Sequence, residues 1–184
     1  MNFNSQYNQI IHNESYEAMK ALMLAGIITG APLSQAAGTV INKPVSSQFQ
    51  KTPRGVRNNN PGNIKKSRDN WQGSIGTDGV FVKFNTMENG IRALARTLKT
   101  YQNRHNCKSI RQIITRWAPP EDNNPTAKYI NFISKNTGID PDTPLNFNRD
   151  EIALIEVIKN IIKFENGIDV NTLTIIKGIR AEEK

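Results

Sequence analysis

The sequence predicts a mainly helical domain with one minor β-hairpin over residues 53–168 of the 184-residue chain. Apolar residues recur at helical spacing in four segments after residue 86, which is the pattern of amphipathic helices. A short apolar and β-branched run, bounded by turn residues, lies at residues 80–84. Residues 58–62, Asn-Asn-Asn-Pro-Gly, form a polar turn, because short amides compete for backbone hydrogen bonds and proline lacks a donor. This order of segments is typical of an α+β domain in which helices dominate.

The first elements are a strand and a long helix. Residues 80–84, VFVKF, lie between Asp78-Gly79 and Asn85-Thr86, so they are expected to form one strand or hairpin arm. Residues 88–103 then carry apolar side chains at helical spacing, and Thr86 is the expected N-cap.

Three further helices follow. Residues 109–117 are expected to be helical until two prolines, Pro119 and Pro120, end the helix. A third helix is expected between Pro125 and Gly138. Residues 145–164 are apolar on a wide surface and predict a central, mostly buried helix. Its expected N-cap is Asn148, with Glu151 in the capping-box position.

Both ends of the chain differ from this domain. Residues 1–52 are expected to be an N-terminal leader or anchor segment with a linker. The apolar run 21–31 is shorter than the ~20 residues that span a bilayer. It fits the apolar region of an export signal peptide, and equally an anchor to a larger particle or a membrane. Residues 169–184 are expected to be a C-terminal tail or docking helix.

The charge of the chain favours an anionic partner. Lysine and arginine number 24 against 16 acidic residues, which gives a net charge of +8. The basic residues are scattered and no nucleic-acid module is recognisable, so no nucleic acid is expected as a partner. Cys107 is the only cysteine, which excludes an intrachain disulfide and a cysteine-based zinc site. The two histidines, His12 and His105, are isolated, so neither a metal nor a cofactor is expected.

The polar turn and the tryptophan behind it predict carbohydrate binding. Amides suit the hydroxyl and acetamido groups of a sugar, and an indole suits its C–H face. The alternative is a loop that caps the next helix and packs Trp71 into the core. The candidate substrate-binding residues here are Asn59, Asn60, Asn63, Trp71 and Gln72.

Glu165 is the candidate catalytic residue. It lies in the last turn of the buried helix, where the helix dipole and apolar neighbours both disfavour negative charge. A carboxyl in such a place can serve as a general acid for a glycosidic oxygen. The alternative is a Glu165 that is simply exposed beyond the helix end. Other acids compete for the role, namely Glu88, Glu121 and Asp122.

The joint spacing of several motifs resembles a known family. RGVRNNNPGNI, WQG, RWAPPEDNNPTAKYI and FENG together resemble phage-associated peptidoglycan-cleaving domains with lysozyme-like, lytic transglycosylase character, over residues 53–167. In many such enzymes a catalytic glutamate ends a helix before a polar segment, and a later helix with a tyrosine closes the cleft. By that comparison residues 60–64 are the polar segment and 126–130 the tyrosine helix. Here the helix that ends in glutamate comes last, at Glu165, so the resemblance implies a permuted lysozyme-like fold in which this helix brings Glu165 beside the Asn-rich turn.

The function that follows is cleavage of the β-1,4 bond between N-acetylmuramic acid and N-acetylglucosamine in peptidoglycan. With no obvious paired aspartate, Glu165 alone is expected to act as acid and then base, giving an anhydro product. Hydrolysis assisted by Glu121 or Asp122 stays open. Tyr129 is expected to position the sugar or stabilise charge near Glu165, and Trp117 to line the groove with Trp71.

The expected setting is a phage particle that opens the wall locally during infection. The chain would then be virion-associated and act in the host periplasm or cell wall, with export by a signal peptide as a further route. Its expected partners are peptidoglycan and other virion proteins, the latter through either terminal segment. The alternative function is a non-catalytic structural virion or wall-binding protein that retains the fold.

Overall fold

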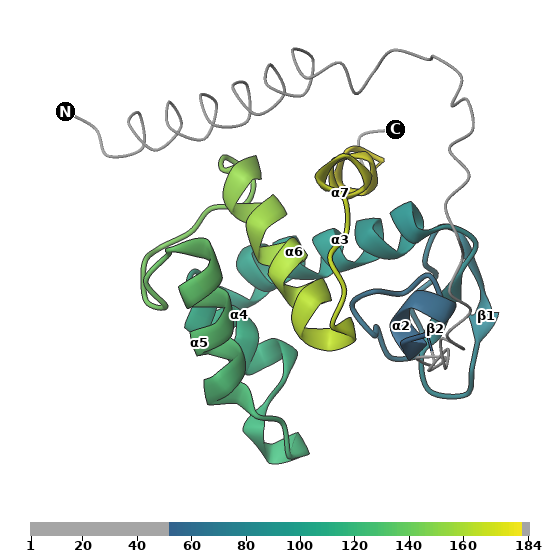
Figure 1. Cartoon of the computed structure of the whole chain (residues 1–184), viewed down its shortest axis with the longest axis horizontal. Helices are drawn as coiled ribbons and strands as arrows, with labels where there is room; N and C mark the ends of the chain where they lie inside the picture. Colours follow the sequence, from purple (N-terminus) through teal and green to yellow (C-terminus); the bar gives the residue numbers. More distant parts are fainter. Residues whose placement is uncertain (1–51, 182–184) are drawn as a thin grey trace, which may run out of the picture. The chain divides into compact units, whose positions relative to one another are not determined.

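A computed structural model describes residues 52–181 of the chain (Figure 1). The predicted leader, anchor and linker lie outside the described residues. The mainly helical class with a minor hairpin is confirmed. Within the described residues, no helix has the length and apolar character needed to cross a membrane. The elements in order are α2 (Arg54–Arg57), β1 (Ser74–Thr77), β2 (Val82–Phe84), α3 (Met87–His105), α4 (Ile110–Trp117), the 3-10 turn η1 (Pro120–Asp122), α5 (Thr126–Thr137), α6 (Glu151–Asn166) and α7 (Thr172–Arg180).

Strand β2 is the strand expected in residues 80–84, and it pairs with β1 in an antiparallel hairpin. Ser74 lies opposite Phe84 and Thr77 opposite Val82, with a bulge between Ser74 and Gly76. The strand begins later than predicted because Val80 belongs to the turn, where its N–H donates to the side chain of Asp78.

Helix caps explain where α3 and α4 begin and where α5 ends. The Thr86 hydroxyl accepts from the N–H of Asn89, and the Ser109 hydroxyl accepts from the N–H of Gln112. Gly138 ends α5 in the left-handed conformation, with φ of 68°. The predicted N-cap at Thr86 and the predicted stop at Gly138 are therefore confirmed.

The predicted start of the buried helix is wrong. Helix α6 begins at Glu151, and its N-cap is Asp150, whose Oδ1 accepts from the N–H of Ala153. Asn148 is used elsewhere, because its Nδ2 donates to Oδ1 of Asn103 on α3. Glu151 does not complete a capping box with Asn148, and its carboxylate pairs with Arg180 on α7.

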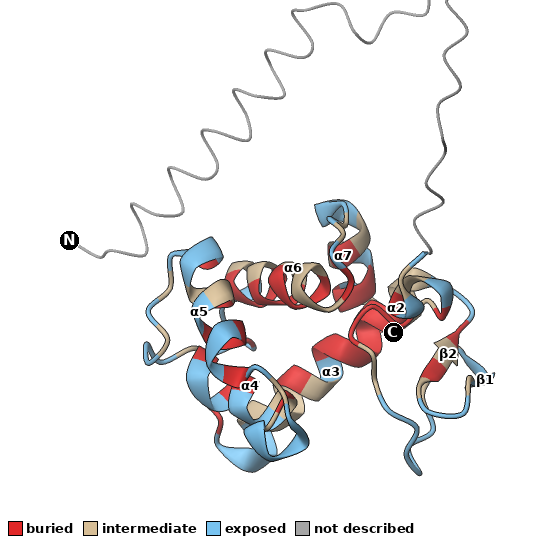
Figure 2. Ribbon diagram, turned by 60° about the horizontal axis from the view of Figure 1, so that its bottom comes forward, coloured by how far each residue is buried: buried red, intermediate tan, exposed pale blue. Residues whose placement is uncertain are grey.

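The core lies between α3, α6 and the helices that pack on them. Figure 1 shows α3 crossing behind α6, with α4 and α5 at one end and the hairpin and α2 at the other. Figure 2 shows that the buried residues are concentrated on α3 and α6. Sixteen residues of α6 make a helix of about 24 Å at 1.5 Å per residue, long enough to join the two ends.

Helix α7 belongs to this core. Ile175 and Ile179 are buried in the same apolar cluster as Ile91 of α3. The helices approach closely, since a Cβ on Gly178 would lie 2.6 Å from Cγ2 of Ile91. The segment predicted as a separate tail or docking helix therefore packs, over Thr172–Arg180, within the domain itself.

Candidate active site

The polar turn is held by its own amides. Asn60 is fully buried, its Nδ2 donates to the carbonyls of Ile64 and Val82, and its Oδ1 accepts from the N–H of Ile64. Both ends of this amide are used, so it stabilises the turn and cannot reach a sugar. The substrate-binding role predicted for Asn60 is corrected to a structural one.

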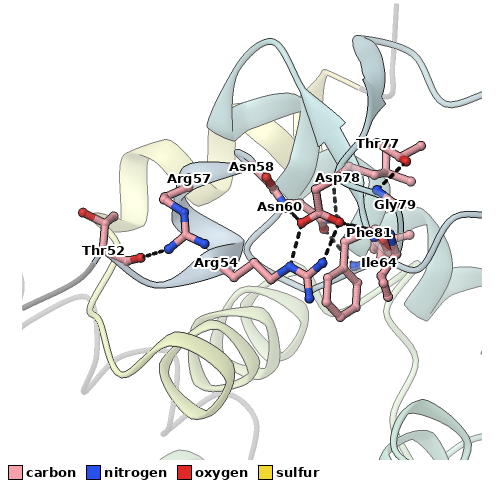
Figure 3. A network of polar contacts seen from close by, with 12 residues as sticks. Thr52, Arg54, Arg57, Asn58, Asn60, Ile64, Thr77, Asp78, Gly79 and Phe81 are labelled. Carbon is pink, nitrogen blue, oxygen red and sulfur yellow. Dashed lines mark hydrogen bonds and ion pairs between the residues drawn. The ribbon is translucent and has the colours of Figure 1, made fainter.

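The carboxylate of Asp78 links the polar turn to the hairpin through hydrogen bonds (Figure 3). Asp78 accepts two hydrogen bonds from the Arg54 guanidinium, at 2.6 and 2.8 Å, and one from Nδ2 of Asn58 at 2.6 Å. Its Oδ1 also accepts from the N–H groups of Val80 and Phe81. These hydrogen bonds hold the pKa of Asp78 far below its usual range. The bond from Arg54 has the largest effect, and the bonds from the N–H of Phe81 and from Nδ2 of Asn58 come next.

Short helix α2 brings the turn against the end of α6. A Cβ on Gly55 would collide with Oδ1 of Asn166 and lie 2.8 Å from the backbone carbonyl oxygen of Asn60, so a larger residue there would force its neighbours to shift. Nδ2 of Asn166 donates to the carbonyl of Pro61 at 2.7 Å. The end of the buried helix and the polar turn are therefore in direct contact.

Three side chains from separate elements donate to the carboxylate of Glu165. Nδ2 of Asn63 lies 3.0 Å from Oε2, and the Tyr129 hydroxyl lies 3.1 Å from Oε1. Nε1 of Trp117 lies 3.3 Å from the same Oε1. Glu165 is half-buried in the last turn of α6. The predicted adjacency of Glu165 to the Asn-rich turn and to Tyr129 is confirmed.

The three donors are not chemically equivalent. The amide of Asn63 and the indole of Trp117 offer only N–H donors to Glu165, whereas the hydroxyl of Tyr129 can donate or accept. Tyr129 can therefore keep its hydrogen bond to Oε1 whether that oxygen carries a proton or not. Tyr129 is therefore the one donor of the three whose polar group can also accept a hydrogen bond from Oε1.

Tyr129 is fixed by burial and by aromatic packing. Its side chain is 1% exposed, and its ring stacks on Phe164 with centroids 3.8 Å apart. Burial, and then the charge of Glu165, raise the pKa of Tyr129 well above its usual value. The hydroxyl is therefore neutral at physiological pH and remains available as a hydrogen-bond donor.

Trp117 is packed between the turn and α3. A Cβ on Gly62 would lie 3.2 Å from both Cη2 of Trp117 and Cδ1 of Leu94, so the turn rests directly on the indole. The Tyr101 ring meets the indole edge to face, with centroids 6.4 Å apart. This packing leaves the indole N–H directed at Glu165.

The other predicted binding residues lie away from Glu165. Trp71 is half-buried and packs against the apolar cluster of Val82, Phe84 and Ala93. Gln72 is exposed beside it, and Nδ2 of Asn59 donates to the carbonyls of Phe84 and Asn85. The core packing weighed as the alternative for Trp71 is thus observed, although Trp71 also lines a neighbouring groove.

The alternative acids are separate from the Glu165 cluster. Glu88 lies in the first turn of α3, and its carbonyl is close to Gly178 of α7. Glu121 and Asp122 are exposed in η1, where Asp122 accepts from Lys65 at 3.5 Å. Among the hydrogen bonds within residues 52–181, none joins these carboxylates to Glu165.

Sequence reasoning missed the residues that hold the cluster together. Asn166 anchors the turn, Phe164 supports Tyr129, and Gly55 permits the close approach of α2. Phe164 and Asn166 flank Glu165 in the chain, so the motif Phe-Glu-Asn-Gly already contained two of the three. Gly55 carried no comparable signal, because its neighbours are distant in sequence.

No protein-family model matches the chain. The chain is similar to a curated protein, Protein P5 of Pseudoalteromonas phage PM2, with 43% identity over 136 residues. The similarity covers 71% of this chain and 82% of that protein. The chain belongs to the P5 family. The predicted phage association is thereby confirmed, and the wall-cleaving activity inferred from the resemblance stays a prediction.

Proposed function

We propose that this P5-family chain cleaves the β-1,4 glycosidic bond between N-acetylmuramic acid and N-acetylglucosamine, with Glu165 as the acid and base. The observation that carries the proposal is the convergence of Asn63, Trp117 and Tyr129 on one carboxylate. These donors come from a turn and two helices, so the fold as a whole sets the position of Glu165. A lysozyme-like fold, permuted so that the glutamate helix is C-terminal, would account for this order.

The chemistry requires one carboxyl in two roles. Glu165 donates its proton to the glycosidic oxygen, the bond from that oxygen to C1 of the muramyl sugar breaks, and positive charge develops at C1. The resulting carboxylate then takes the proton from the muramyl C6 hydroxyl while that oxygen bonds to C1. The products are a new sugar hydroxyl and a 1,6-anhydro ring, and Glu165 is protonated again. If water attacks instead, Glu121 or Asp122 would have to approach from η1.

Tyr129 and Asn63 have positioning roles in this proposal. The Tyr129 hydroxyl would donate to Oε1 when that oxygen is ionised and accept from it when it is protonated, and Nδ2 of Asn63 donates to Oε2. Trp117 lines the site beside Oε1. The net charge of +8 would draw a small phage protein toward an anionic cell wall. Carriage in the phage particle, where it could open the wall at infection, is part of the proposal.

The test is digestion of purified sacculi by the wild type and by Glu165→Gln, with soluble muropeptides identified by mass spectrometry. The matched control is Glu156→Gln, which changes a glutamate of the same helix whose ion pair with Lys159 is 3.9 Å long. We expect anhydro-muropeptides from the wild type and the control, and none from Glu165→Gln. Circular dichroism melts would show that all three proteins are folded.

Other products would change the proposal in defined ways. Reducing-end muropeptides that depend on Glu165 would keep the site and replace the intramolecular attack by hydrolysis. No release by the wild type, together with retained binding to sacculi, would overturn cleavage and favour a non-catalytic wall-binding protein.

A further inference from the structure

A groove of about 710 Å³ lies between residues 64–72 and one face of α3. It adjoins the Glu165 cluster without being part of it. Ile64 in its wall follows Asn63 in the chain, and Tyr101 in its wall contacts the indole of Trp117 edge to face. A polymer bound at Glu165 could therefore extend one substituent into this groove.

The walls of the groove are strongly basic. Lys65, Arg92, Arg96 and Arg104 line it, against one carboxylate, Asp69. Arg92 and Arg96 are four residues apart and share one face of α3, and Arg104 lines the same groove about two turns further along the helix. Arg92 is 7% exposed and its Nε donates to the carbonyl of Ala181 at 3.3 Å, which fixes that end of the row.

The charge of the walls indicates which ligand the groove suits. Guanidinium groups pair with carboxylates through two parallel hydrogen bonds, which strengthens and orients the contact. The groove thus offers positive charge and N–H donors, and its chemical complement is a ligand with carboxylate oxygens.

We propose that this groove binds the peptide carboxylates of the wall polymer, so that the chain selects glycan that carries peptides over bare glycan. This inference rests on the proposed function. A cavity of this size matches a short peptide, since small-ligand pockets are about 300–1,000 Å³. The groove also stands beside the carboxyl that would cut the glycan, which favours a wall peptide over a nucleic acid.

The test uses sedimentation of the full chain with intact sacculi and with sacculi stripped of peptides by an amidase, at fixed salt. The groove variant is Arg96→Gln with Arg104→Gln. The control is Lys135→Gln with Arg149→Gln, which removes the same charge from exposed positions outside the groove. We expect the wild type and the control to bind intact sacculi about tenfold more tightly than stripped sacculi, which is ~1.4 kcal/mol. The groove variant should bind both equally.

The remaining outcomes distinguish failure of the groove inference from failure of the proposed cleavage. Equal binding of intact and stripped sacculi by the wild type overturns the groove inference, whether or not sacculi are cleaved. A preference for intact sacculi without cleavage overturns the proposed activity and keeps the groove. If the control variant loses the preference for intact sacculi as fully as the groove variant does, the preference comes from net charge, and the groove inference is overturned. Tight binding of a single-stranded oligonucleotide that competes with sacculi and requires Arg96 and Arg104 would also overturn it.

Discussion

Tyr129 connects the apolar core to the candidate catalytic carboxyl. Its ring lies in the stack with Phe164, and its hydroxyl reaches Oε1 of Glu165. The stack spans two helices, because Tyr129 belongs to α5 and Phe164 to α6. The position of the hydroxyl is therefore set by core packing, and the role of the ring can be separated from the role of the hydroxyl.

Tyr129→Phe makes that separation. The ring and its stack remain, and one hydrogen bond to Glu165 is lost, so the free energy of unfolding should fall by about 0.5–1.5 kcal/mol. Release of muropeptides from sacculi should fall much further, by about 10²-fold, if the hydroxyl holds the carboxyl during proton transfer. Denaturant unfolding and muropeptide release measure the two effects. Unchanged release with lowered stability would reduce Tyr129 to a structural residue.

Gly55 is the residue whose size allows α2 to reach α6. Gly55→Ala would place a methyl group against the side chains of Asn63 and Asn166 and against the backbone carbonyl of Asn60, so these side chains or α2 itself must shift beside the Glu165 cluster. We expect a loss of about 1–3 kcal/mol in unfolding free energy, together with impaired muropeptide release.

Gly138→Ala is the matched control for Gly55→Ala. Gly138 has φ of 68° and open space around its Cα, so only backbone strain of about 1–2 kcal/mol is expected. This variant should release muropeptides at the wild-type rate. If both variants lose stability equally and both keep activity, the contact of α2 with α6 does not position the site.

At the scale of elements, Asp78 joins α2, the polar turn and the hairpin through one carboxylate (Figure 3). Because its pKa is lowered in the folded state, the ionised form stabilises the fold. That contribution is complete above the pKa of the unfolded carboxyl, about 3.9, and is lost progressively as the pH falls below it.

Asp78→Asn tests this linkage. At neutral pH the variant should melt at a lower temperature, because the amide cannot pair with the Arg54 guanidinium. As the pH falls from 4 toward 2, the difference in melting temperature between the wild type and the variant should shrink. Thermal melts followed by circular dichroism across that range measure it. A difference that stays constant with pH would show that the charge of Asp78 does not matter.

The elements that were predictable are those defined by local chemistry. Thr86 and Gly138 mark helix ends because a hydroxyl cap and a left-handed glycine act within one turn of the chain. The start of α6 was missed because Asn148 binds Asn103, which lies 45 residues away and has no local signal. The place of α7 was missed for the same reason, since its apolar face suits an external partner as well as α3.

In the candidate site too, features set by local chemistry were predictable and features set by distant contacts were not. Asn60 and Asn63 look alike in the sequence, but one is buried with its amide bonded to backbone and the other faces Glu165. The residues differ in tertiary surroundings, which periodicity and composition do not report. The position of Glu165 was predictable because the end of a long apolar helix is visible in the sequence, and because the motif order of the resembled family implies that this helix meets the polar turn. Its catalytic role stays a prediction.

At the scale of the whole molecule, the described residues contain every group that the proposed chemistry uses. Asn63, Trp117, Tyr129 and Glu165 all lie in the compact unit of residues 49–184, together with the apolar core. The net charge of +8 belongs to the whole chain. Catalysis should therefore depend on this unit, and any delivery or anchoring role would belong to the segment before it.

A fragment of residues 49–184 tests this division of roles. We expect it to unfold in one cooperative transition, since its core residues all lie within it. In the proposed mechanism, it should release muropeptides from purified sacculi within about twofold of the full chain, because it retains the three described side chains that donate to Glu165. Glu165→Gln in the same fragment is the control. A folded fragment with less than a tenth of the activity would place part of the catalytic or substrate-binding apparatus in residues 1–48, and the site described for residues 52–181 would then be incomplete.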